Sequence, residues 1–255
     1  MITFSEAQLT AWLAPLIWPF LRTLALFTSA PVLSSRAFPV RARIGLAFFV
    51  ALAAQPSLGQ QPVIGMNEAG ALGAVIQQVG VGLAIGFAIR VVFAAVELAG
   101  EVAGFQMGLN FASFFDPTLN TQSSAVSRFF GQITLFIFIV MNGHLMVLLA
   151  VIKSFQAFPV DQNFLQALQQ MKMLDLGVNL FASGLWISLP MVGVLMFANL
   201  ALGIVSRVAP QMNIYAIGFP ITLTVGLIGM AATLPMLDEP LMGLMERALD
   251  VFSVW

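Results

Sequence analysis

The chain contains no cysteine, one histidine and few charged residues, with Asp, Glu, Lys and Arg making up 8% of its 255 residues. Without cysteine, disulfides, thiolate metal sites and cysteine nucleophiles are excluded together. The ten basic residues are scattered and the net charge is −1. No basic surface can therefore neutralise a run of phosphates, and nucleic acid is not expected as a partner.

Motifs that carry catalysis are missing as well. The patterns G-x-S-x-G, H-E-x-x-H, G-x-x-x-x-G-K-[ST] and G-x-G-x-x-G do not occur. We therefore expect no enzymatic activity and no cofactor. The single histidine, His144, lies within an apolar run and has no nearby carboxylate with which to build a zinc site. It is interpreted as a residue with a structural hydrogen bond, and a proton relay is the alternative.

Apolar residues are abundant instead. They form 60% of the chain, and the mean hydropathy is +0.97, whereas soluble domains are roughly 45–50% apolar. The sequence therefore predicts an all-α integral membrane protein with helices of about 20 apolar residues each. Six apolar runs are found at residues 11–33, 44–54, 69–96, 129–152, 176–205 and 214–237.

The ends of these runs suggest an orientation. Arg36, Arg41 and Arg43 lie between the first two runs without a nearby acid, which predicts a cytoplasmic loop. Residues 44–54 are too few to span a bilayer unaided and are expected to form half of a hairpin. Residues 238–255 mix charged and apolar side chains, which predicts a short amphipathic helix or loop.

Glycine is concentrated in one region, with eight of the 21 glycines between Gly70 and Gly108. As one helix this region would be about 58 Å long at 1.5 Å per residue, so it must leave the membrane or break. Small residues at four-residue spacing allow close helix packing. We expect this stripe to pack on a neighbouring subunit; alternatively, its charges merely lie at a headgroup interface. The packing glycines are Gly82, Gly86, Gly100, Gly104 and Gly108, and the charges are Arg90, Glu97 and Glu101.

A phenylalanine-rich segment follows directly. Residues 105–117 read F-Q-M-G-L-N-F-A-S-F-F-D-P, and Asp116-Pro117 is a turn signal. Its apolar side chains therefore lie at a helix end, where irregular backbone is tolerated in a membrane only inside protein or along an aqueous cavity. An apolar loop in a lumen can seal it by dewetting. The alternative is an ordinary loop buried in the core.

A proline-bounded turn joins the last two runs. Residues 207–220 read R-V-A-P-Q-M-N-I-Y-A-I-G-F-P, and this pattern predicts a tight helical hairpin. Gln211 and Asn213 are expected to bond the free carbonyls of the preceding helix end. The alternative is a cytoplasmic contact site made of Arg207, Pro210, Gln211 and Asn213.

Residues 105–117 and 209–227 resemble the two most recognisable stretches of the FliR family, the R subunits of the flagellar type III export gate. The length, the hydropathy and the order of the apolar runs also match over nearly the whole chain. The second stretch, A-P-Q-M-N-I-Y-A-I-G-F-P-I-T-L-T-V-G-L, favours the flagellar branch over the injectisome homologues.

The resemblance implies a structural subunit of the bacterial inner membrane and flagellar basal body. It implies assembly with P and Q export-gate subunits around a path for unfolded flagellar proteins, contacts with a B-type export switch subunit and an A-type export subunit, and contact with lipid. It further implies a P-like part over residues 1–172 and a Q-like hairpin part over residues 173–255. Because much of such an assembly is held above the membrane plane, six spans need not all cross it.

The resemblance also implies a plug loop at about residues 105–122, within the P-like part, that contains the phenylalanine-rich segment and closes the channel. The sealing residues that it implies are Phe105, Met107, Leu109, Phe111, Phe114 and Phe115. The rival function is a secondary transporter of a small solute that uses Arg90 and Glu97. A transporter should show two matching halves and a convergent polar site, and neither is visible in the sequence.

Overall fold

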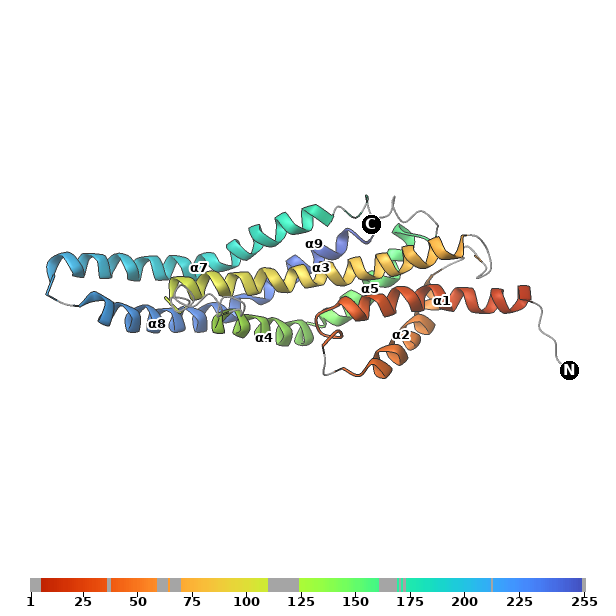
Figure 1. Ribbon diagram of the computed structural model, residues 1–255, viewed down its shortest axis with the longest axis horizontal. Coiled ribbons are helices and arrows are strands. Elements are labelled where there is room, and N and C mark those ends of the chain that lie inside the picture. Colours follow the sequence, from red (N-terminus) through yellow and green to blue (C-terminus); the bar gives the residue numbers. More distant parts are fainter. Residues whose placement is uncertain are drawn as a thin grey trace. The chain divides into compact units, whose positions relative to one another are not determined.

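The computed structural model describes residues 6–35, 38–58, 64, 70–109, 124–160, 169, 171, 173–211 and 213–253. These parts are helical and contain no strand, so the predicted all-α class is confirmed (Figure 1). The helices are α1 (Glu6–Ser29), α2 (Val40–Ala54), α3 (Ala71–Gln106), α4 (Ala125–Val140), α5 (Gly143–Ala157), α7 (Met173–Val208), α8 (Ile214–Thr233) and α9 (Asp238–Asp250). Single 3₁₀ turns, Gln55–Ser57 and Leu234–Met236, follow α2 and α8.

Each predicted apolar run overlaps a helix, but the helices differ in length. Within the described ranges, three segments are long and apolar enough to cross a membrane: Ala71–Gln106, Leu174–Val208 and Ala216–Met236. A fourth is counted if α4 and α5 form one interrupted span. The predicted tail helix is found as α9, whereas Arg36 of the predicted cytoplasmic loop lies outside the described residues.

The predicted run at residues 129–152 is interrupted at Asn142. This residue has φ 57°, a left-handed conformation that asparagine tolerates better than most residues because its short polar side chain can bond locally. Helix α4 therefore ends before Asn142, and α5 begins at Gly143. The run itself does not reveal this break, because an Asn-Gly pair inside an apolar run lowers its mean hydropathy only slightly.

The chain divides into two compact units. Unit 1 consists of residues 1–91, 142–177 and 245–255, and unit 2 consists of residues 92–141 and 178–244. Helices α3 and α7 each contribute one part to unit 1 and the other part to unit 2. The predicted division near residue 172 separates a P-like part from a Q-like part by resemblance to other subunits, whereas these two units are defined by contacts within the chain. The predicted division therefore stays a prediction.

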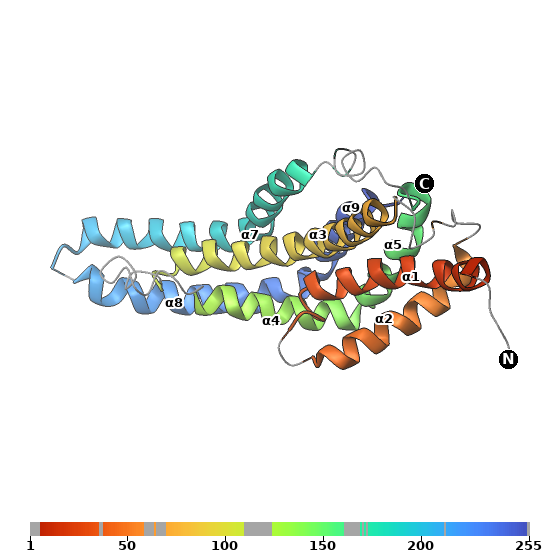
Figure 2. The same ribbon diagram turned by 45° about the vertical axis from the view of Figure 1, so that its right-hand side comes forward.

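In unit 1, α1 and α2 form a hairpin and lie side by side in both views (Figures 1 and 2). Three alanines of α2 are buried, Ala47, Ala51 and Ala54, while larger side chains such as Phe49 remain exposed. Small residues let the two helices approach closely. The predicted half-hairpin over residues 44–54 is therefore confirmed. The C-terminal end joins the same unit through Phe252, which packs on Phe158 with ring centroids 6.4 Å apart.

In unit 2, the second part of α3 contacts α4 and α7, and Met107, which directly follows α3, contacts α8. Phe93 of α3 and Phe138 of α4 meet edge to face, with ring centroids 5.5 Å apart. Gly184 of α7 lies against α3, since a Cβ built on it would be 2.8 Å from the carbonyl oxygen of Ala95. Helices α7 and α8 are joined by the predicted turn and run back along each other as a hairpin (Figure 1).

Candidate functional site

The first part of α3 packs on α1 through glycines. A Cβ added at Gly82 would collide with the backbone carbonyl of Arg22, and one added at Gly86 would collide with the hydroxyl of Ser29. The Cβ of Ala25 would lie 2.8 Å from that added Cβ of Gly82. Because α1 also carries small residues four apart, at Ala25 and Ser29, the two helices form a close pair of the small-xxx-small kind.

The second part of α3 makes a similar contact with the start of α4. A Cβ at Gly100 would lie 2.9 Å from the Cα of Ser127, and one at Gly104 would lie 3.2 Å from the Oγ of Ser124. Any side chain at Gly100 would therefore force the helix backbones apart. The same helix thus carries two glycine pairs of equal spacing, one in each unit.

The predicted packing glycines Gly82, Gly86, Gly100 and Gly104 lie against helices of their own chain. That the stripe also packs on a neighbouring subunit stays a prediction. The four-residue spacing indicates correctly that backbones approach each other, because only a residue without a side chain permits the approach. It carries no information about which helix approaches.

Gly108 has a different role from the other four. Its φ is +79°, and it ends α3. Its N–H donates to the Phe105 carbonyl (3.0 Å), and the N–H of Leu109 donates to the Gly104 carbonyl (3.1 Å). These two bonds form a Schellman motif, in which glycine is favoured because a Cβ penalises the left-handed conformation. Gly108 therefore sets where the chain leaves the helix.

Met107 is held next to this cap. Its side chain is fully buried, and a Cβ at Gly226 of α8 would lie 2.5 Å from its Cγ. The Thr222 hydroxyl of α8 donates to the Met107 carbonyl (3.3 Å). Of the other predicted sealing residues, Phe105 is exposed and Leu109 is half-buried. Phe111, Phe114 and Phe115 lie outside the described residues.

The predicted charged stripe separates into different environments. Arg90 and Glu97 are exposed, in unit 1 and unit 2 respectively. Glu101 is half-buried and accepts a hydrogen bond from the backbone N–H of Ser124 (3.1 Å). One of the three charges is therefore engaged with the backbone where α4 begins.

The predicted turn between α7 and α8 is exposed. The side chains of Arg207, Pro210, Gln211 and Asn213 all face outward. Asn213 precedes α8, and its Oδ1 accepts from the N–H of Ala216 (3.4 Å). Asn213 therefore caps the helix that follows it, as asparagine often does. That Gln211 and Asn213 bond the carbonyls at the end of α7 stays a prediction.

Arg22 is a buried polar residue that the sequence analysis misses. Its Nε donates to Gln78 Oε1 (2.9 Å), its Nη1 to Ser154 Oγ (2.9 Å) and its Nη2 to the Phe158 carbonyl (2.7 Å). Its Cζ lies 3.6 Å from the ring centroid of Phe155. The guanidinium thereby connects α1, α3 and α5 within unit 1. The signal was available, because Arg22 is the only charge in the run 11–33 and such residues are functional candidates by default.

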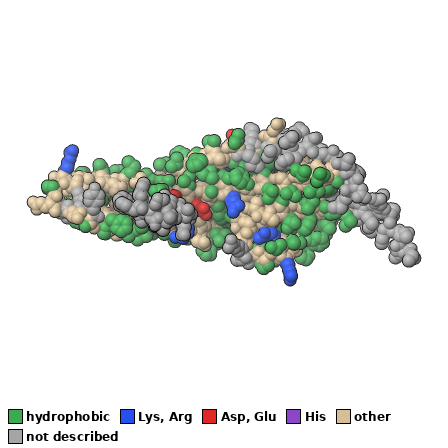
Figure 3. Space-filling model, in the orientation of Figure 1, with side chains coloured by type: hydrophobic (Ala, Val, Ile, Leu, Met, Phe, Trp, Pro, Cys, Tyr) green, Lys and Arg blue, Asp and Glu red, His purple; other side chains and the backbone are tan. Residues whose placement is uncertain are grey.

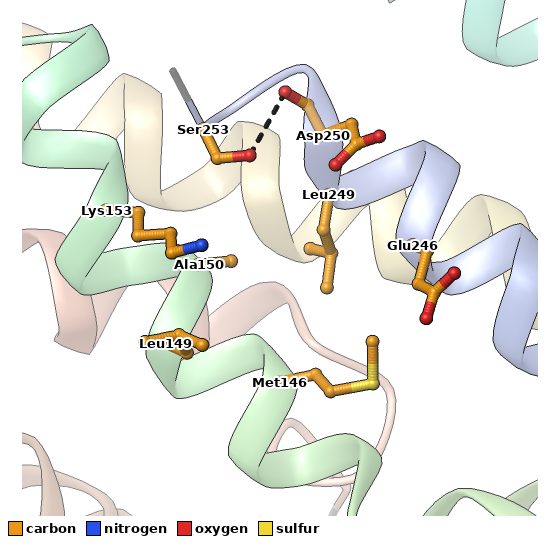
Figure 4. Close-up of a pocket in the computed structure, with 8 residues that line it drawn as sticks. All are labelled: Met146, Leu149, Ala150, Lys153, Glu246, Leu249, Asp250 and Ser253. Atoms are coloured by element: carbon orange, nitrogen blue, oxygen red, sulfur yellow. Dashed lines mark hydrogen bonds between the residues drawn. The ribbon is translucent and has the colours of Figure 1, made fainter. Parts of the chain in front are cut away.

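A cavity of about 340 Å³ opens between α5 and α9 in unit 1 (Figure 4). The side chains around it combine apolar walls with charged groups from both helices, and the Ser253 hydroxyl donates to the Asp250 carbonyl (3.4 Å). The described residues contain no cluster of three or more potential metal ligands. His144 lies on α5 and is exposed. The lining residues are Met146, Leu149, Ala150, Lys153, Glu246, Leu249, Asp250 and Ser253.

Much of the outer surface is apolar. On the face shown in Figure 3, apolar side chains are widespread and charged ones are isolated. Helix α7 is the clearest case, with Trp186 exposed to 74% and Phe197 to 75%. Soluble monomers rarely leave contiguous apolar surfaces of this kind uncovered. Together with the long apolar helices, these surfaces define an all-helical protein of the membrane-embedded class.

Comparisons with known proteins identify the family. Residues 13–248 match the family model described as Bacterial export proteins, family 1. The chain is 38% identical over 239 residues to the flagellar biosynthetic protein FliR of Escherichia coli K12, covering 93% of this chain and 90% of that protein. It is 36% identical to FliR of Pectobacterium carotovorum (99% and 97%) and 32% identical to FliR of Bacillus subtilis 168 (82% and 82%). The chain belongs to the bacterial export protein family 1.

Proposed function

We propose that this chain is a structural, non-catalytic subunit of the flagellar type III protein export gate, located in the bacterial inner membrane at the flagellar basal body. The observation that carries this proposal is the family match over residues 13–248, together with curated relatives named flagellar biosynthetic protein. The long apolar helices agree with a place in a membrane assembly. A transporter centred on Arg90 and Glu97 has no support, since the match is to export proteins.

The partners that this function requires are P and Q export-gate subunits, a B-type export switch subunit and an A-type export subunit, with unfolded flagellar proteins as cargo. The exposed apolar side chains of α7 support a large contact with other subunits or lipid. The exposed side chains of Arg207, Pro210, Gln211 and Asn213 form the candidate cytoplasmic contact for the B-type subunit. The proposed P-like part covers residues 1–172 and the Q-like part covers residues 173–255.

The proposed plug begins where α3 ends. Met107 and the cap at Gly108 fix the start of the segment, and Phe111, Phe114 and Phe115 supply rings that would exclude water from a lumen. Replacing these three phenylalanines with alanine should make cells that express the complete gate permeable to small ions. Conductance equal to that of the parent gate would show that the three rings do not seal a channel.

The proposed function is tested by identifying what co-purifies with the chain. The chain would be tagged, extracted from the membranes of its own host in mild detergent, and its partners identified by mass. Recovery with P-like and Q-like export subunits is expected. Recovery as a lone monomer or a homodimer under the same conditions would overturn the export-gate proposal.

A further inference from the structure

The first turn of α4 lacks a negative charge of its own. Helix α4 begins at Ala125 and has no acidic residue in its first turn. Its N-cap is Ser124, whose Oγ accepts from the N–H of Ser127 (3.0 Å). In a capping box, a Glu or Gln three residues after the cap would accept the N–H of the cap residue. Here that position is Ser127, and its hydroxyl donates instead to the Glu97 carbonyl (2.9 Å).

The missing carboxylate is supplied by α3. Oε2 of Glu101 accepts the backbone N–H of Ser124 at 3.1 Å. A carboxylate beside a helix N-terminus is stabilised by the free N–H groups and the helix dipole. Glu101 therefore has the same relation to Ser124 that the acidic member of a capping box has, although it lies 23 residues earlier on another helix.

Gly104 brings the two helices close enough for this bond. The Oγ of Ser124 is 3.2 Å from the point where a Cβ of Gly104 would lie. On the other side of the same residue, the Gly104 carbonyl accepts the N–H of Leu109 (3.1 Å). Leu109, where the chain leaves α3, and Ser124, the N-cap of α4, thus both lie against Gly104.

We propose that Glu101 is a positioning residue whose carboxylate completes the N-terminal cap of α4 and thereby holds the two ends of residues 110–123 together on one turn of α3. Its consequence for transport rests on the proposed function, because those residues include the proposed sealing phenylalanines. Gly104 has a supporting role, since a Cβ at this position would lie 3.2 Å from the Ser124 Oγ and would press on the cap residue. Glu101, Gly104 and Ser124 all belong to unit 2.

The test uses the absence of cysteine, which lets two introduced cysteines carry spin labels without a background signal from the chain itself. Gln106→Cys on α3 and Arg128→Cys on α4 place the labels on either side of the Glu101–Ser124 bond. Both positions lie at least partly on the surface and outside the cap itself. The distribution of distances between the labels would be measured in the full chain, purified with whatever subunits accompany it.

Three variants separate the hydrogen bond from packing. Glu101→Leu keeps the volume but cannot accept the Ser124 N–H, so the distance distribution should broaden and gain a longer population. Glu101→Gln retains an acceptor oxygen, so it should restore most of the narrow distribution. Glu239→Leu, which removes an exposed carboxylate at the start of α9, is the matched control and should leave the distribution unchanged.

An unchanged distribution in Glu101→Leu would overturn the inference, and so would equal broadening in Glu101→Gln and Glu101→Leu. Ion conductance measured on the same variants separates this inference from the plug. A broadened distribution with parental conductance would support the positioning role of Glu101 and contradict only the plug. Broadening accompanied by a leak, with both effects reversed in Glu101→Gln, would support both.

Discussion

Helices α3 and α7 have the same length and similar apolar character, yet the chain covers them very differently. Each has 36 residues. In the most apolar window of α3, 67% of the residues are buried, against 17% in the corresponding window of α7. Hydropathy therefore indicates that a helix is shielded from water, but it does not indicate what shields it. Helix α3 is covered by other helices of its own chain, whereas α7 must be covered by lipid or by other subunits.

The glycines of the two helices show the same difference. On α3, Gly82 and Gly100 face backbone atoms of neighbouring helices, so a side chain at either position would force a shift. On α7, a Cβ added at Gly177, Gly193 or Gly203 would have no atom of another helix within 4 Å. Gly184 is the exception, since it contacts α3. A glycine in a membrane helix therefore does not by itself show that another helix of the same chain packs against it.

The largest expected effect is the loss of the buried guanidinium that holds α3 to α1 and α5. Arg22→Leu should lower the free energy of unfolding by about 3 kcal/mol or more, because Gln78, Ser154 and the Phe158 carbonyl each lose a charged donor. Arg22→Lys should not restore it, since an ammonium cannot reproduce the planar fork. Arg207→Leu, at the exposed end of α7, is the control and should change the midpoint of thermal unfolding little.

A smaller effect on stability is expected when a single methyl group is added to a glycine of α3 or of α7. Gly82→Ala should destabilise by about 1–3 kcal/mol, because the added Cβ meets the carbonyl of Arg22. Gly193→Ala on α7 should be neutral or stabilising by up to about 1 kcal/mol, since its Cβ meets nothing and alanine is the better helix former. Thermal unfolding of the purified chain distinguishes the two. Equal destabilisation by the two variants would contradict the view that α3 is closely packed at Gly82 while α7 is uncovered at Gly193.

The contact between Met107 and Gly226 of α8 predicts that substitutions at the two positions have coupled effects on stability. Gly226→Ala should cost about 1 kcal/mol, because its Cβ would lie 2.5 Å from a flexible side chain that can partly move away. Met107→Ala leaves a cavity and should cost about 2–5 kcal/mol. The double variant should be less destabilised than the sum of the two, with a coupling of about 0.5 kcal/mol or more. Additive losses in a double-mutant cycle would show that the two side chains do not share this space.

The smallest effect on the stability of the chain itself is expected on the outer face of α7. Trp186→Ser and Phe197→Ser remove side chains that are about three-quarters exposed, at 74% and 75%. The thermal midpoint of the isolated chain should change little, whereas recovery of partner subunits in mild detergent should fall. Full recovery of partners with both variants would indicate that this face meets only lipid.

The sequence predicts the helical class, the α7–α8 hairpin and the amphipathic tail, because these depend on periodicity, proline and composition within short stretches. It also predicts close packing at the glycines of α3. It does not predict that Gly82 meets Arg22 or that Glu101 caps α4, because both contacts join residues far apart in the chain. The left-handed residue Asn142 is missed for another reason, since one backbone angle can interrupt an otherwise uniform apolar run.

The central claim is that the chain covers α3 itself, and we propose that other subunits cover α7. A photo-crosslinking amino acid placed at Phe197 of α7, or at Ile89 of α3, which is 1% exposed, tests it directly in cells. We expect adducts with another export protein from position 197 and none from position 89. Protein adducts from both positions, or only lipid adducts from position 197, would contradict the account.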